Sequence, residues 1–314
     1  MLASGEPRTV AFPATFVRVC AVCAGLSVGG SPPVTAQPAG ESALGGVAAS
    51  VRSAGLNGAG VALVGTAGSV FTNPAGLATI RRVALEVGYR AAPFDAVLTT
   101  AAVGWRVGQF DVGVGLQHFE FGTTPVPQMP AGAPADASEL LAVGSLVYRF
   151  GLIALGATGK YAAQDLVTLR HNGVSADVGL AIAVFDIMAL GFAVQNLGGN
   201  WRGSDFKMAR LIRTGFTMNY VDPQGTVRLL STIEIQWPEG RRSRVVLGGE
   251  GGIVVGGVGI VGRLAHKSGL AASDGAAMTY GATLELGSID VDFAYEPNDV
   301  TDRPSRRIGL RMSL

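Results

Sequence analysis

Most of this chain alternates between apolar and polar residues with a period of two. In residues 289–295 the odd positions are Ile, Val, Phe and Tyr, and Asp290 and Asp292 lie between them. In residues 307–314 the even positions are Ile, Leu, Met and Leu, and the odd positions are polar or glycine. A period of two is typical of a β-strand with one apolar and one polar face. From Val83 onward we therefore predict a succession of half-buried strands.

This alternation is compatible with two architectures. In a soluble sandwich the apolar face of each strand points to the core, whereas in a membrane barrel it points to the lipid and the polar face lines the lumen. In both, antiparallel pairing of the last two strands would bring Asp290 and Asp292 beside Arg307 and Arg311 on the polar face. Alternation alone does not distinguish the two architectures.

Composition favours the barrel. Only 15% of the residues are charged and the mean hydropathy is +0.37, whereas charged residues make up about 25% of a soluble domain. A helical membrane protein needs unbroken apolar stretches of about 20 residues. Glycine, proline or charged residues interrupt every candidate, including residues 53–80. Because only helices and closed barrels pair all their backbone groups within a bilayer, we expect a barrel.

Turn signals divide the rest of the chain into fourteen predicted strands. They are residues 83–90, 96–107, 109–121, 139–150, 152–165, 171–185, 187–195, 210–221, 226–237, 243–251, 253–266, 276–287, 288–296 and 305–314. The predicted fold class is all-β, a transmembrane antiparallel β-barrel of about fourteen strands.

The predicted connections alternate in length along the chain. The short ones are Gly108, Gly151, Asp186, residues 222–225, Gly252 and residues 287–288. The longer ones lie around Pro93 and at residues 122–138, 166–170, 196–209, 238–242, 267–275 and 297–304. Short periplasmic turns, long extracellular loops and an even strand count are typical of bacterial outer-membrane barrels. We therefore predict a multi-pass protein of the bacterial outer membrane with both termini in the periplasm.

The N-terminal segment has the layout of a secretory signal peptide. Arg8 and Arg18 precede the apolar residues 19–28, and the small-residue sequence Val-Thr-Ala ends at Ala36. A basic region, an apolar region and a small-residue site are the three parts of such a signal. We predict cleavage after Ala36. Both cysteines of the chain belong to this segment, so we expect no metal or redox site in them.

The predicted organisation follows from these boundaries. Residues 1–36 form the signal peptide, residues 37–46 a linker, residues 47–82 an N-terminal plug or hatch segment, and residues 83–314 the barrel. A fourteen-stranded barrel lies between small barrels filled by side chains and the wider porins with an aqueous channel. Its lumen needs an occupant if it is to be closed, and the Ala- and Gly-rich plug segment can provide one.

Two motifs carry a resemblance to a known family. One is Gly-Ala-Gly-Val-Ala-Leu at residues 58–63 followed by Phe-Thr-Asn-Pro-Ala-Gly-Leu-Ala at residues 71–78, and the other is Phe-Ala-Val-Gln-Asn-Leu-Gly at residues 192–198. With them the chain resembles the PorV/PorQ family of outer-membrane proteins and, more distantly, the FadL transporters of hydrophobic compounds. The resemblance implies a fourteen-stranded barrel with an N-terminal segment folded into the lumen.

The plug motif Asn73, Pro74, Ala75 and Gly76 is the first candidate site. Asn can bond backbone groups and Pro ends regular structure, so the motif predicts a rigid, non-helical corner. The corner is either a gate over the lumen or a structural element that closes the periplasmic end.

Inward-facing charges form the second candidate site. They are Asp177, Arg228, Glu234, Asp290, Asp292, Arg307 and Arg311. They either line a polar pathway or form ladders that stiffen the wall, because opposite charges on neighbouring strands attract one another.

We expect no enzymatic activity, metal site or cofactor. The three histidines, His118, His171 and His266, are far apart in the sequence and have no ligand spacing. Gly-x-Ser-x-Gly occurs only at residues 25–29, inside the predicted signal peptide, and not in the predicted mature chain. A net charge of +1 without a basic block gives no indication of nucleic-acid binding.

The sequence leaves three hypotheses for function. The barrel passes small hydrophobic molecules across the outer membrane, or it engages secreted cargo or an attachment complex, as some PorV-like proteins do with the type IX secretion machinery, or it is a scaffold without a substrate. An apolar lumen pocket with a lateral opening would favour the first, and an exposed apolar patch on the extracellular loops, especially 122–138 or 196–209, would favour the second. Outer-membrane lipid is an expected partner, as is the barrel-assembly machinery through strand 305–314.

Overall fold

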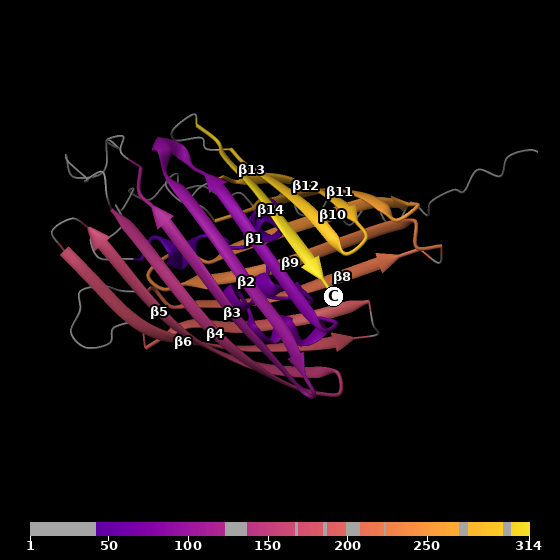
Figure 1. Ribbon diagram of the computed structural model, residues 1–314, viewed down its shortest axis with the longest axis horizontal. Coiled ribbons are helices and arrows are strands. Elements are labelled where there is room, and N and C mark those ends of the chain that lie inside the picture. The colour runs from indigo at the N-terminus through magenta and orange to yellow at the C-terminus, as the bar shows by residue number, and fades with distance from the viewer. Residues whose placement is uncertain are drawn as a thin grey trace, which may run out of the picture. The chain divides into compact units, whose positions relative to one another are not determined.

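Fourteen antiparallel strands close into a barrel in the computed structural model of the chain (Figure 1). The structure describes residues 42–122, 137–166, 169–184, 187–198, 208–222, 224–269, 276–297 and 303–314. The strands are β1 (Val83–Ala91), β2 (Val97–Val107), β3 (Phe110–Glu120), β4 (Ser138–Phe150), β5 (Ile153–Leu166), β6 (Leu169–Val184), β7 (Met188–Leu197), β8 (Leu211–Val221), β9 (Val227–Pro238), β10 (Arg244–Val255), β11 (Val258–Lys267), β12 (Met278–Leu286), β13 (Ile289–Glu296) and β14 (Ser305–Ser313).

Each strand pairs with its neighbours in sequence, and β1 and β14 close the ring. Figure 1 shows the two side by side although they stand at opposite ends of the barrel sequence, and their register runs from Ala84 opposite Ser313 to Ala91 opposite Arg306. Closure leaves no strand edge with unpaired backbone groups. The predicted fold class and the strand count are therefore confirmed.

One predicted turn is misplaced. The turn between the tenth and eleventh strands was expected at Gly252, but β10 continues to Val255 and the chain turns at Gly256 and Gly257. Both turn glycines have positive φ, 62° and 83°, which a two-residue type I′ hairpin requires. Gly252 lies inside the strand opposite Val261. There a Cβ would stand 2.6 Å from a Val261 methyl carbon, so close packing rather than a turn accounts for this glycine.

The two faces of the strands are inverted relative to a soluble protein. In β13 the side chain of Asp292 is 1% exposed inside the barrel, whereas Ile289 and Phe293 point outward and are 43% and 44% exposed. The same holds around the ring, where outward positions carry Val, Leu, Ile, Phe and Tyr and inward positions carry the buried charged and polar residues. An apolar outer surface of this extent is typical of a barrel that is surrounded by the hydrocarbon chains of membrane lipids. The structure thus selects the membrane barrel over the sandwich.

Residues 42–80, which we call the plug segment, lie inside the ring of strands and contain only short helical turns. These are η2 (Leu44–Gly46), α2 (Val51–Gly55), η3 (Ala67–Phe71) and η4 (Pro74–Thr79). Leu56, Val61, Val70 and Leu77 are completely buried between this segment and the wall. Nowhere in the described residues is a helix both long and apolar enough to cross a bilayer.

Candidate functional site

Wall carboxylates bind the backbone N–H groups of the plug segment. Glu234 of β9 accepts hydrogen bonds from the N–H groups of Gly60 at 2.7 Å and Val61 at 2.9 Å. Glu86 of β1 accepts one from Gly68 at 2.9 Å. These carboxylates hold two separate turns of the plug segment against opposite parts of the wall.

A third carboxylate holds the start of the plug segment. Glu139 of β4 accepts hydrogen bonds from the Ala43 N–H at 2.8 Å, the Leu44 N–H at 3.3 Å and the Ser42 hydroxyl. Residues 42–46, which the sequence assigns to the linker, are thus bonded to the barrel wall because a buried carboxylate stands opposite their N–H groups.

Wall cations and amides bind the plug carbonyls in the same way. Gln195 of β7 donates to the Phe71 carbonyl at 2.8 Å, and Arg106 of β2 donates to the Ala78 carbonyl at 2.7 Å. Arg213 of β8 donates to the Gly58 carbonyl, and Arg307 of β14 donates to the Ala48 carbonyl. The wall therefore satisfies both donors and acceptors of the plug backbone.

Irregular structure in the lumen makes these bonds necessary. A buried backbone without a helix or sheet ladder leaves N–H and C=O groups that need other partners. Hydrogen bonds to charged groups are roughly twice as strong as neutral ones. Sequence reasoning missed Glu86, Glu139, Arg106 and Arg213 as contacts of the plug segment. Each stands at a polar position of its strand, a signal that marks it as lumen-facing without naming its partner.

Asn73 is the central residue of the plug corner. Its side chain is 0% exposed, and its amide donates to the Val61 carbonyl at 2.6 Å and to the Leu180 carbonyl of β6 at 3.1 Å. Its Oδ1 accepts the Ala75 N–H at 3.1 Å, so Asn73 also caps the turn η4, in which Pro74 takes the first position. One side chain therefore joins two plug turns to the wall.

Inward-facing glycines make room for this corner. A Cβ on Gly156 of β5 would stand 2.8 Å from the Ala75 nitrogen, and one on Gly179 of β6 would stand 2.0 Å from Asn73 Oδ1. Within the corner, a Cβ on Gly76 would stand 2.7 Å from the Ser69 hydroxyl oxygen. The wall and the motif are thus complementary in shape at Asn73, Pro74, Ala75 and Gly76.

We expect Gly179→Ala to destabilise the folded barrel by about 1–3 kcal/mol, because the added methyl group overpacks the contact with the Asn73 amide. Gly144→Ala is the matched control, since Gly144 of β4 points outward and its Cβ would meet nothing within 4 Å. The temperature at which the folded band on a detergent gel converts to the unfolded mobility measures the effect. Equal shifts in the two variants would mean that the plug corner does not press on the wall at Gly179.

All seven predicted lumen charges take part in ion pairs. Asp177 pairs with Lys160 at 2.7 Å, and Glu234 pairs with Arg213 at 2.5 Å. At the rim with the short turns, Arg228 pairs with Glu285 at 2.9 Å. Asp177 and Glu234 are buried, whereas Arg228 is substantially exposed. Each charge thus faces a charge of opposite sign, and whether they stiffen the wall or line a pathway stays a prediction.

The last two strands contain the remaining predicted charges. Arg311 pairs with Asp290 at 3.1 Å and also binds Asp292. Arg307 pairs with Glu296 at 2.7 Å rather than with either aspartate. In the register Arg307 stands opposite Ala294, two residues from both Asp292 and Glu296, and Asp292 is already bound by Arg263 and Arg311.

An ion-pair network connects these strands to the plug segment. Arg52 of α2 binds Glu250 of β10 through two hydrogen bonds of 2.9 and 2.7 Å. Arg263 of β11 pairs with Glu250 at 3.2 Å and with Asp292 at 3.1 Å. The plug segment is therefore tied to three strands through one arginine that the sequence pattern did not single out.

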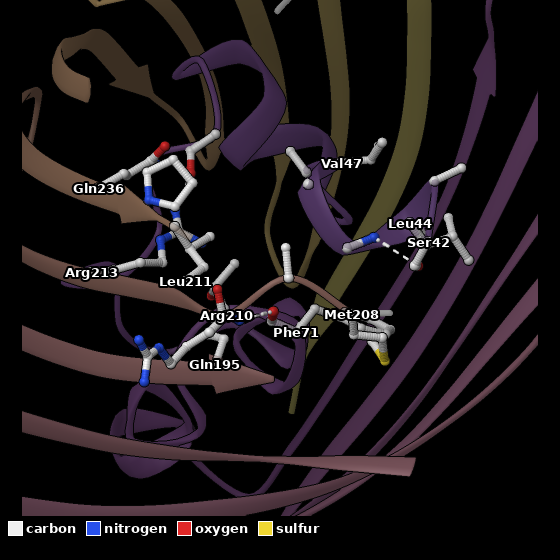
Figure 2. Close-up of a pocket in the computed structure, with 18 of the residues that line it drawn as sticks. Ser42, Leu44, Val47, Phe71, Gln195, Met208, Arg210, Leu211, Arg213 and Gln236 are labelled. Atoms are coloured by element: carbon white, nitrogen blue, oxygen red, sulfur yellow. Dashed lines mark hydrogen bonds between the residues drawn. The ribbon is translucent and has the colours of Figure 1, made fainter. Parts of the chain in front are cut away.

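A cavity of about 140 Å³ opens at the barrel end that carries the long connections, and we call it the outer cavity. Its lining comes from the start of the plug segment, from Gly58 and Phe71, and from the adjoining parts of β3 to β5 and β7 to β11. In the view of Figure 2, Arg210, Arg213 and Gln236 lie on one side and Leu44 and Met208 on the other. The cavity thus has a polar and an apolar wall.

A second cavity of about 370 Å³, the inner cavity, lies at the end with the short turns. The wall of this cavity is formed mainly by apolar residues of β5 to β7, and Ala62, Leu63 and Val64 cover it from the plug side. Gly58 lines the outer cavity and Ala62 lines the inner one, so residues 59–61 stand between the two. We call residues 58–62 the barrier segment.

Three side chains hold the barrier segment. Glu234 binds its N–H groups, Arg213 binds the carbonyl of Gly58, and Asn73 binds the carbonyl of Val61. Asn73 and Glu234, which the sequence assigns to separate candidate sites, therefore meet at one place. In the part of the chain that the structure describes, no group of three or more His, Cys, Asp or Glu side chains is arranged to hold a metal ion.

Comparison with known proteins addresses the fold. No protein family profile and no curated protein sequence matches this chain. The Ralstonia pickettii toluene transporter TbuX superimposes with a TM-score of 0.60 at 12% identity, over 87% of this chain and 99% of that chain. This chain shares its fold with that transporter. The P. putida toluene transporter TodX gives a TM-score of 0.56 at 10% identity, over 86% of this chain and 99% of that chain.

A third solved structure agrees with these two. The CymD monoaromatic hydrocarbon channel superimposes with a TM-score of 0.54 at 12% identity, over 87% of this chain and 98% of that chain. The shared architecture is that of outer-membrane barrels, which supports the predicted place in the bacterial outer membrane. Most of loops 122–138 and 196–209 lies outside the described residues, so the role in secretion stays a prediction of the sequence.

Proposed function

We propose that this barrel passes small hydrophobic molecules across the outer membrane along a path that the barrier segment closes. The observation that carries the proposal is the pair of cavities on opposite sides of residues 59–61. A closed transport path requires a cavity on each side of a short barrier, which is the arrangement found around these residues.

The chemistry of the inner cavity supports a hydrophobic cargo. Its lining includes Leu63 of the plug segment and the inward-facing Ala154, Ala181 and Ala189 of the wall, and its volume of about 370 Å³ is sufficient for a small organic molecule. The fold that this chain shares with transporters of toluene and channels for monoaromatic hydrocarbons supports the same class of cargo.

The gate in this proposal is the barrier segment, and Asn73 is the residue that keeps it closed. The Asn73 amide donates one hydrogen bond to the Val61 carbonyl of the barrier segment and another to the Leu180 carbonyl of β6, so it ties the barrier segment to the wall. A shift of residues 59–61 away from Glu234 and Asn73 would join the outer and inner cavities. Because these bonds are few and local, the gate can open while the strands stay paired.

The orientation and the finer family assignment are part of the same proposal. The long connections face the cell exterior and the two chain termini face the periplasm, as the alternating connection lengths indicate. Strand β14 is the contact for the barrel-assembly machinery. The Asn-Pro-Ala-Gly corner supports a place in the PorV/PorQ branch of these barrels.

The proposal is tested by narrowing the inner cavity. Ala189 of β7 lines the inner cavity, and the next residue, Leu190, points outward and is exposed toward the lipid. We expect cells with the wild-type barrel in their outer membrane to take up radiolabelled toluene faster than cells without it. Ala189→Trp is expected to lower the initial rate to that of cells without the barrel, and Leu190→Trp to leave it unchanged.

The amount of folded barrel in the outer membrane, measured on a detergent gel without heating, serves as the control for both variants. If the wild-type barrel gives no increase in uptake, or if folded Ala189→Trp transports as well as Leu190→Trp, the proposed path is wrong.

A further inference from the structure

The outer cavity has a charge pattern that a neutral hydrocarbon does not require. Six basic side chains are among the residues that line it, and none of the described lining residues is Asp or Glu. The basic residues are Lys160, Arg210, Arg213, Arg241, Arg244 and Lys267. A concave site lined by charges of one sign attracts ions of the opposite sign.

The basic residues that line the outer cavity differ in whether a carboxylate pairs with them. Lys160 and Arg213 have carboxylate partners in the wall, Asp177 and Glu234. Lys267 at the end of β11 is different, because no carboxylate among the described residues lies within the 4.0 Å ion-pair limit of its amine. The carboxylates that act on it electrostatically, Glu234 and Glu296, lie beyond that limit, so a bound anion would compensate this partly buried ammonium group directly.

The position of Lys267 connects this charge to the gate. Its Nζ lies 3.4 Å from the point where a Cβ on Gly58 would stand, and Gly58 is the first residue of the barrier segment. An anion bound by Lys267 would therefore stand next to the residues that separate the two cavities.

The opposite wall of the outer cavity is apolar. It includes Leu44, Val47, Phe71 and Met208, and Figure 2 shows Leu44 and Met208 across the cavity from Arg210 and Arg213. A simple inorganic anion would leave this apolar surface uncovered. A ligand with one charged end and one apolar end would contact both walls.

The volume limits the size of the apolar part. The outer cavity measures about 140 Å³. An apolar cavity of about 150 Å³ accommodates a benzene molecule. One aromatic ring fits the outer cavity, and a long acyl chain does not.

We infer that the outer cavity binds a small amphipathic organic anion, a single aromatic ring with a carboxylate. This inference rests on the proposed function and deepens it, since it names the class of cargo that first enters the path. The carboxylate contacts Lys267 and Arg210, and the ring packs against Phe71 and Met208. Lys267 draws the anion toward the barrier segment, and the apolar wall and the inner cavity receive its ring.

Equilibrium binding to the full-length protein in detergent tests the inference. Isothermal titration calorimetry with benzoate, benzyl alcohol and benzylamine compares an anion, a neutral molecule and a cation that share one ring. We expect benzoate to bind at least about ten-fold more tightly than the other two. The affinity for benzoate is expected to fall as the salt concentration rises, because salt screens the attraction between the charges.

Two substitutions and a control locate the site. Lys267→Gln and Arg210→Gln are each expected to weaken benzoate binding about ten-fold, because each removes a charge-assisted hydrogen bond. Arg228→Gln removes the same charge at the opposite rim and is expected to leave benzoate binding unchanged. Arg210 is exposed, so its variant gives the answer even if Lys267→Gln does not fold.

The outcomes separate this inference from the proposed function. If benzyl alcohol binds as tightly as benzoate, if benzoate does not bind, or if Arg228→Gln weakens binding as much as Arg210→Gln, the anion site is wrong. Toluene uptake that depends on Ala189 but not on Leu190 would then still support the path. Benzoate binding together with a failed uptake experiment would instead leave an anion site on a barrel that does not transport.

Discussion

Replacing Asn73 with alanine is expected to open the barrier segment in an otherwise intact barrel. The substitution removes two donated hydrogen bonds and one accepted hydrogen bond, and all three partners are backbone groups at a buried site. Each buried group left without a partner costs about 1–3 kcal/mol. A loss of about 3 kcal/mol corresponds to about a hundred-fold rise in the open population.

A cysteine at the barrier measures this change. Ala62 is buried at the inner end of the barrier segment, and Ala62→Cys can be followed with a polar maleimide in a chain that carries Cys20→Ser and Cys23→Ser. We expect Asn73→Ala to accelerate the labelling by roughly the factor of the open population. The strands stay paired, so the folded band on a detergent gel is expected to persist.

Asn219→Ala is the control for this experiment. Asn219 of β8 faces the inner cavity and is exposed, so the same substitution there removes an amide without touching the plug segment. If Asn73→Ala labels no faster than Asn219→Ala, Asn73 does not hold the barrier. The corner would then be a structural element only, which is the other alternative that the sequence leaves open.

The barrel itself was predictable because its signals are local. Alternation assigns each strand residue to one of two faces, and glycine, proline and asparagine mark the ends, so the strand count follows without tertiary information. Gly252 shows the limit of this reasoning. A glycine required by a turn and a glycine required by close packing cannot be told apart in a sequence. In the structure the positive φ values of Gly256 and Gly257 identify the turn, and the contact with Val261 explains Gly252.

The site was less predictable because its contacts cross the lumen. The sequence identifies Asn73 from its motif and Glu234 from its polar position, but it contains no sign that both bind Val61 of the plug segment. Irregular backbone has no period, and the bond from Glu234 to Gly60 joins residues 174 positions apart. Glu86 and Glu139 were missed for the same reason, since polarity at an inward position does not name a partner.

Glu234→Gln is expected to produce the largest loss of stability among changes to the wall. Glu234 accepts hydrogen bonds from Gly60 and Val61, and it is the carboxylate partner of the buried Arg213. Glutamine has the same size, but it leaves the guanidinium without a counter-charge. Breaking a buried ion pair on one side costs about 3–5 kcal/mol, whereas an exposed pair is worth about 0–1 kcal/mol.

The exposed pair between Arg228 and Glu285 provides the comparison. We expect Glu234→Gln to lower the thermal midpoint of the folded barrel clearly, and Glu285→Gln to leave it nearly unchanged. The double variant Arg213→Met with Glu234→Gln removes both charges and is expected to recover part of the loss, since no uncompensated charge remains. Glu234 has two roles, since it pairs with Arg213 in the wall and binds the N–H groups of Gly60 and Val61 in the barrier segment. If the double variant regains the thermal midpoint while its Ala62→Cys form is still labelled fast, the wall is stable again but the barrier stays open, and the two roles are separate. A midpoint for Glu234→Gln equal to that of Glu285→Gln would show that the Glu234 carboxylate does not stabilise the wall, and labelling of Ala62→Cys no faster in Glu234→Gln than in Glu285→Gln would show that it does not hold the barrier segment.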